Sequence, residues 1–123
     1  MLRSITVVIL TVLLTGNNMS GQEEITTRAE KSDYKSTSDY KDVINFIDQL
    51  KSVSKNIRVE TIARSAEGRD MPLLVIGKPL PDTHEDLAND SRIVIYVEAN
   101  IHAGEVEGKE ASLMFARDIL EGK

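Results

Sequence analysis

The central feature of the sequence is residues 91–120, which read SRIVIYVEANIHAGEVEGKEASLMFARDIL. They begin with a near-continuous apolar run at 93–97, and such a run is typical of a strand buried on both faces of a sheet. From residue 105 onwards, apolar residues recur at helical intervals instead. The stretch therefore predicts a buried strand followed by a helix over 105–120, with Gly122 as its C-cap.

His102 and Glu105 lie at the junction between this strand and this helix. Ligands of open α/β sheets bind at the carboxyl ends of strands, and zinc takes imidazole nitrogen and carboxylate oxygen as ligands. The two side chains, bent around Gly104, can converge on one metal ion, and the start of a helix favours an ionised carboxylate. The spacing alone also fits a structural, hydrogen-bonded pair. The helical motifs H-E-x-x-H and H-x-x-E-H are absent.

Composition narrows the class of protein. A chain of 123 residues corresponds to one domain or less. Its net charge of -5 argues against a nucleic-acid partner, which would favour a basic face. The sequence contains no cysteine, which excludes disulfides, zinc fingers and thiol nucleophiles.

The pattern of the first 21 residues predicts a targeting segment. Arg3 is followed by a short apolar stretch at 5–14, shorter than the roughly 20 residues that a membrane-spanning helix needs. This pattern is typical of a secretory signal peptide, here residues 1–21, and predicts a secreted or periplasmic protein without a stable membrane anchor. An uncleaved anchor is the alternative. Residues 22–38 are polar and lack periodicity, so we expect a flexible leader there.

The rest of the chain predicts a helix and a hairpin ahead of the central strand. Apolar spacing predicts a packing helix over 40–54, capped by Ser38 or Asp39. Strands are predicted at 57–64 and 71–76, joined by a turn in which Gly68 takes positive φ, and a surface loop at 78–90 in which His84 is exposed. A central strand buried on both faces needs neighbours on both edges. We therefore expect residues 39–123 to be the N-terminal part of a larger domain.

From about residue 40 to 120 the chain resembles the zinc metallocarboxypeptidases, in particular their bacterial secreted members. The resemblance rests on three segments in order: DYKDVINFIDQL, ETIARSAEGRDMPLLVIG and IVIYVEANIHAGEVEGKEA. It implies an α/β fold, a three-layer αβα sandwich around a mixed sheet of the phosphorylase/hydrolase-like kind. It also implies one Zn²⁺ ion and, as substrates, the C-termini of peptides or proteins, from which amino acids are removed.

By this resemblance, His102 and Glu105 match the first two zinc ligands. The family's second histidine ligand, its general-base glutamate and its substrate-binding residues lie further downstream than Lys123, so no catalytic residue is assigned here. We therefore expect the chain alone to be inactive. The digestive members of the family have an arginine where this sequence has Gly104. Two alternatives stay open: a zinc amidohydrolase of the aspartoacylase-like group, with a similar His-x-x-Glu loop, and a non-enzymatic secreted module.

Overall fold

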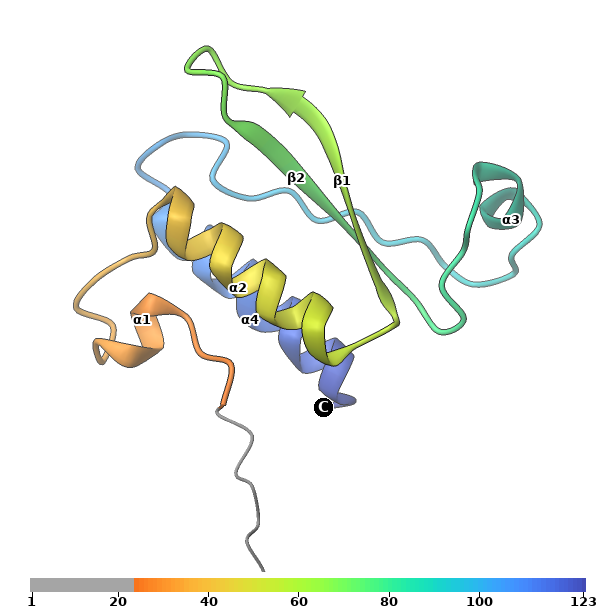
Figure 1. Ribbon diagram of the computed structural model, residues 1–123, viewed down its shortest axis with the longest axis horizontal. Helices are drawn as coiled ribbons and strands as arrows, with labels where there is room; N and C mark the ends of the chain where they lie inside the picture. The colour runs from red at the N-terminus through yellow and green to blue at the C-terminus, as the bar shows by residue number, and fades with distance from the viewer. Residues whose placement is uncertain (1–23) are drawn as a thin grey trace, which may run out of the picture.

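The computed structural model describes residues 24–123 of the chain (Figure 1). Its elements in chain order are α1 (Arg28–Lys31), α2 (Tyr40–Val53), β1 (Ile57–Arg64), β2 (Asp70–Ile76), α3 (His84–Ala88) and α4 (Val106–Glu121). The signal peptide predicted for 1–21 lies outside the described residues. Within 24–123, no helix is both long enough and apolar enough to cross a membrane.

Helix α2 forms where the apolar spacing predicts it. Asp39 is its N-cap: the Asp39 carboxylate accepts a hydrogen bond from the Asp42 N–H at 2.9 Å, and the Asp42 carboxylate accepts one from the Asp39 N–H at 3.0 Å. This reciprocal arrangement satisfies backbone donors that a helix start leaves free. The apolar face of α2 buries Phe46, Ile47 and Leu50.

The predicted β-hairpin is confirmed. Strands β1 and β2 pair antiparallel, from Ile57 opposite Ile76 to Arg64 opposite Asp70. At the turn between them Gly68 takes φ 77°, a conformation that costs glycine no steric penalty. The pairing register shifts between Thr61 and Ala63. Such an irregularity explains why the alternation of apolar residues along β1 breaks at this point.

The hairpin lies over the pair of helices α2 and α4, which run side by side (Figure 1). The core lies where these elements meet. Its buried members are Ile25, Phe46, Ile47, Leu50, Ile57, Leu113 and Ala116. The chain thus has the mixed α/β character that we predicted, with a sheet of two strands in the part that the structure describes.

The prediction of a buried strand at 93–97 is wrong for this structure. These residues are in no strand, and their exposed fractions run from 53% at Val97 to 88% at Ile93. Figure 1 shows the segment running extended across the hairpin without joining it. A strand needs a partner for its backbone groups, and the sheet in the described residues consists of β1 and β2, neither of which pairs with 93–97.

Two further segments differ from the prediction. Residues 24–38, expected to form a flexible leader, pack against the helices and bury Ile25, Thr27, Ala29 and Ser38. The loop expected at 78–90 contains the short helix α3, because Thr83 and Asp86 form a capping box at its start.

Candidate metal centre

The turn that precedes α4 carries both predicted ligands. The Glu105 N–H donates to the His102 carbonyl at 3.0 Å, and Asn100 takes φ 59° just before this turn. Gly104 does not have positive φ, and a Cβ added to it would meet no atom within 4 Å. The turn therefore does not use the conformational freedom that we expected of Gly104. The left-handed residue is an asparagine, which tolerates this backbone better than most residues.

The side chains of His102 and Glu105 converge in this turn. Imidazole Nδ1 of His102 lies 2.8 Å from Oε1 of Glu105, and the His102 N–H donates to Oε2 at 3.4 Å. Glu105 is the N-cap residue of α4, but its side chain makes no capping hydrogen bond. Its carboxylate instead faces the imidazole, so the pair forms one small patch of nitrogen and oxygen donors.

The pair is open to solvent. The side chain of His102 is 80% exposed and that of Glu105 is 54% exposed. A purely structural ion pair at this exposure contributes little to stability, because water screens it. An exposed imidazole and carboxylate, however, are accessible to an ion from solution.

The donor set fits zinc in its chemistry. Tetrahedral ligation at about 2.0 to 2.1 Å places two ligand atoms about 3.3 Å apart, whereas Nδ1 of His102 and Oε1 of Glu105 lie 2.8 Å apart. A metal would therefore replace the hydrogen bond of the pair, at the cost of a small outward movement of two exposed side chains. Nδ1 is the ring nitrogen that faces the carboxylate, and ligation by this atom needs the neutral tautomer with its proton on Nε2.

Among the residues that the structure describes, His102 and Glu105 are brought together without a third donor of this kind. Within residues 24–123, no group of three or more His, Cys, Asp or Glu side chains could hold a metal ion. His84, predicted to be a surface residue, is exposed at the start of α3, which lies away from the beginning of α4 (Figure 1).

Sequence reasoning missed two charged side chains that are buried on α4, Glu110 and Arg117, which are 5% and 7% exposed. Both share a helical face with the core residue Leu113, which follows Glu110 by three residues and precedes Arg117 by four. A charged residue within an apolar helical stripe is the pattern that could have identified them.

Comparison with known proteins places the turn inside a region that matches a protein family. No curated protein and no solved structure matches the chain. The family model described as zinc carboxypeptidase matches residues 43–123, a range that includes His102 and Glu105. This match covers well over half of the sequence and extends from α2 to α4. The chain therefore belongs to the zinc carboxypeptidase family.

Proposed function

We propose that His102 and Glu105 are two of the protein ligands of a catalytic zinc ion in a carboxypeptidase. The observation that carries this proposal is their convergence to 2.8 Å on an exposed turn inside the region that matches the family. When bound, zinc polarises a carbonyl oxygen and lowers the pKa of a metal-bound water. The reaction assigned to the site is hydrolysis of the C-terminal peptide bond of a peptide or protein.

The chain's own contribution is to hold two ligand atoms in place. The hydrogen bond from the Glu105 N–H to the His102 carbonyl fixes the spacing of the two residues, and α4 fixes the direction in which the chain leaves the turn. As the N-cap residue of α4, Glu105 is held where the turn meets the helix.

The site needs more than these two residues. A catalytic zinc site commonly has three protein ligands and one open position, and the described residues bring two donors together. We therefore propose that a third ligand and a general base complete the site within a three-layer αβα domain. We expect the present chain to lack peptidase activity and to bind zinc weakly, because two ligands give little preorganisation.

The proposed setting is outside the cytoplasm, as in the bacterial secreted members of the family. It is supported by the signal-peptide pattern at residues 1–21, a positive start followed by a short apolar stretch.

A zinc titration followed by NMR of the two histidine rings tests the ligand assignment. We expect the His102 ring signals to shift at lower zinc concentration than those of His84, which is exposed and serves as an internal reference. Glu105→Ala should remove this difference, whereas His84→Ala should leave the His102 response unchanged. Equal responses of both rings, or a His102 response that survives Glu105→Ala, would contradict the assignment.

A further inference from the structure

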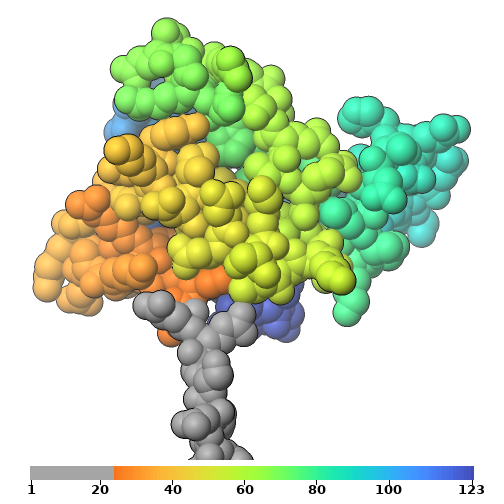
Figure 2. Space-filling model, in the orientation of Figure 1, coloured from red at the N-terminus to blue at the C-terminus, as the bar shows by residue number. Residues whose placement is uncertain are grey.

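Residues 24–38, here called the N-terminal strap, lie against α2 and α4 although they precede the region that matches the family. Figure 2 shows their orange surface in contact with the yellow surface of α2. Thr27, Ala29 and Ser38 are between 2% and 4% exposed. Burial at this level indicates a segment that is docked rather than loosely attached.

The end of the strap supplies the partners of a buried carboxylate on α4. Oε1 of Glu110 accepts hydrogen bonds from the Thr37 hydroxyl at 2.7 Å and from the Ser38 N–H, and Oε2 accepts one from the Ser38 hydroxyl at 3.0 Å. The neighbouring Lys109 ammonium donates to the Ser38 carbonyl. A buried carboxylate needs such donors, because burial without them is strongly unfavourable.

The beginning of the strap supplies the partners of a buried cation on the same helix. Nη1 of Arg117 donates to the Ile25 carbonyl at 3.0 Å and to both carboxylate oxygens of Glu30, at 2.8 and 2.9 Å. The side chain of Arg117 is 9% exposed and that of Glu30 is 19% exposed. Glu30 is held in turn, because its carboxylate closes the capping box of α1 with Thr27.

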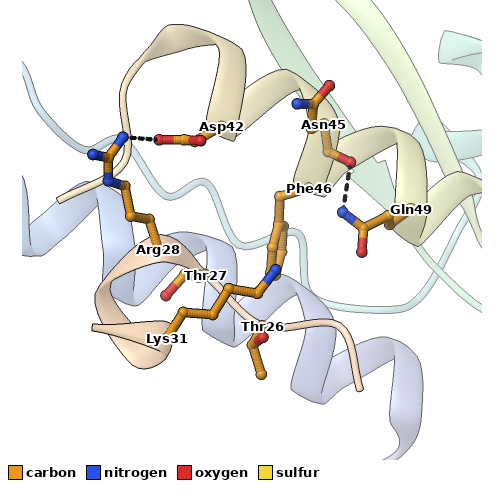
Figure 3. A pocket seen from close by; sticks show the side chains of 8 residues that line it. All are labelled: Thr26, Thr27, Arg28, Lys31, Asp42, Asn45, Phe46 and Gln49. Carbon is orange, nitrogen blue, oxygen red and sulfur yellow. Dashed lines mark hydrogen bonds and ion pairs between the residues drawn. The ribbon is translucent and has the colours of Figure 1, made fainter. Parts of the chain in front are cut away.

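The contact of the strap with α2 is looser and more exposed. Figure 3 shows Arg28 reaching Asp42, a pair at 3.0 Å whose side chains are 51% and 33% exposed. Beside this pair, residues of the strap and of α2, among them Thr26 and Phe46, line an open hollow of about 300 Å³. The buried charges of α4, rather than this surface pair, therefore determine where the strap docks.

We propose that the face of α4 that carries Glu110 and Arg117 is a docking surface, that its occupant is the chain's own N-terminal strap, and that these two buried charges hold the strap in place. Glu110 and Arg117 are the two anchors, and each takes its partners mainly from the strap. Removal of residues 24–38 would leave both charges without these partners. The strap is therefore part of the folded unit, although it lies upstream of the family match, which begins at residue 43. This proposal does not depend on zinc binding.

Limited trypsin digestion of the full chain, followed by mass spectrometry, tests the docking. Cleavage after Lys31 reports opening of the strap, and cleavage after Arg69, in the exposed hairpin turn, is the reference. Because cleavage follows the population of the open form, Glu110→Gln and Arg117→Gln should each accelerate cutting after Lys31 by about tenfold or more. Cutting after Arg69 should stay constant.

Glu60→Gln is the matched control, since Glu60 forms an exposed pair with Arg58 on β1 and should change neither rate. If an anchor variant unfolds globally, both sites will be cut faster together. Ser38→Ala then serves as the milder variant, since it removes one hydroxyl donor and should still accelerate cleavage after Lys31 selectively. Two results would overturn the proposal. One is cleavage of the wild-type chain after Lys31 as rapid as after Arg69. The other is a rate of cleavage after Lys31 that stays at the wild-type value in Glu110→Gln, Arg117→Gln and Ser38→Ala.

Discussion

Leu50 on α2 is 1% exposed and belongs to the core formed by α2, α4 and the hairpin. Truncation of a fully buried leucine removes apolar contacts and leaves a cavity that close-packed neighbours fill only in part. Val53 lies less than one turn further along α2 and is 46% exposed. Two aliphatic residues of one helix thus differ strongly in how much their side chains contribute to the stability of the fold.

We predict that Leu50→Ala lowers the free energy of unfolding by about 2 to 5 kcal/mol. Val53→Ala is the control on the same helix and should change it by about 0.5 kcal/mol or less, because its side chain is half exposed. Urea denaturation followed by circular dichroism measures both. Similar losses in the two variants would contradict the position of the core.

At the scale of elements, the contact between the strap and α4 consists of ionisable groups. Burial alone would raise the pKa of Glu110, but hydrogen bonds from Ser38 and Thr37 outweigh it and hold the pKa below its ordinary value of 4.5. The pKa of Glu30 is likewise lowered: burial raises it, and the hydrogen bonds from Thr27 and the charge of Arg117 lower it by more. The strap is therefore held by two carboxylates that are more acidic in the folded state.

A carboxyl group whose pKa is lowered by folding stabilises the protein above its unfolded pKa, and this contribution is lost as the pH falls through the folded pKa. We therefore predict that stability is retained above about pH 5.5 and decreases from about pH 4.5 downwards. The pKa of Arg117 is raised, despite the lowering effect of burial, by hydrogen bonds to Glu30 and Asp118. Arg117 therefore stays charged and adds nothing to the dependence of stability on pH in this range.

Thermal unfolding between pH 3 and pH 7 measures this dependence. The double variant Glu30→Gln, Glu110→Gln should be less stable at pH 7 and should show a smaller loss on acidification. Glu60→Gln, a change of the same kind on the exposed part of β1, should keep the wild-type profile. An acid dependence that is identical in the double variant and the wild type would mean that the strap contacts do not contribute to it.

At the scale of the whole molecule, the apolar segment 93–97 is the largest departure from what hydropathy predicts. Residues 93–97 are all more than half exposed, and Ile101 is 65% exposed. An extended apolar segment with free backbone groups is a site at which chains associate. The same residues would stabilise the protein if a neighbouring strand covered them.

We predict that Ile95→Lys decreases self-association of the chain and changes the free energy of unfolding by about 0.5 kcal/mol or less, since Ile95 is 75% exposed. Sedimentation velocity measures the association, and urea denaturation measures the stability. Ile62→Lys is the control: Ile62 is an apolar residue of β1 that is 53% exposed and lies outside the segment. A loss of several kcal/mol on Ile95→Lys would indicate a buried strand at 93–97.

The sequence predicted those features that depend on neighbouring residues. The ends of α2 follow from the cap at Asp39 and from apolar spacing, and the hairpin turn follows from Gly68. The His102 and Glu105 pair follows from a spacing of three residues across a turn. Gly104 was the exception, since the left-handed residue near this turn is Asn100. The turn could be predicted, but not the residue that takes the unusual backbone.

The sequence by itself therefore determined α2, α4, the hairpin, the proximity of two donor side chains and the family. Tertiary structure alone decided which residues are buried. Glu110 meets Ser38 across a separation of 72 residues, and Arg117 meets Ile25 across 92. Apolar character likewise could not determine whether 93–97 is covered. The physical reason is that burial depends on which surfaces pack together, and local composition fixes only the periodicity of those surfaces.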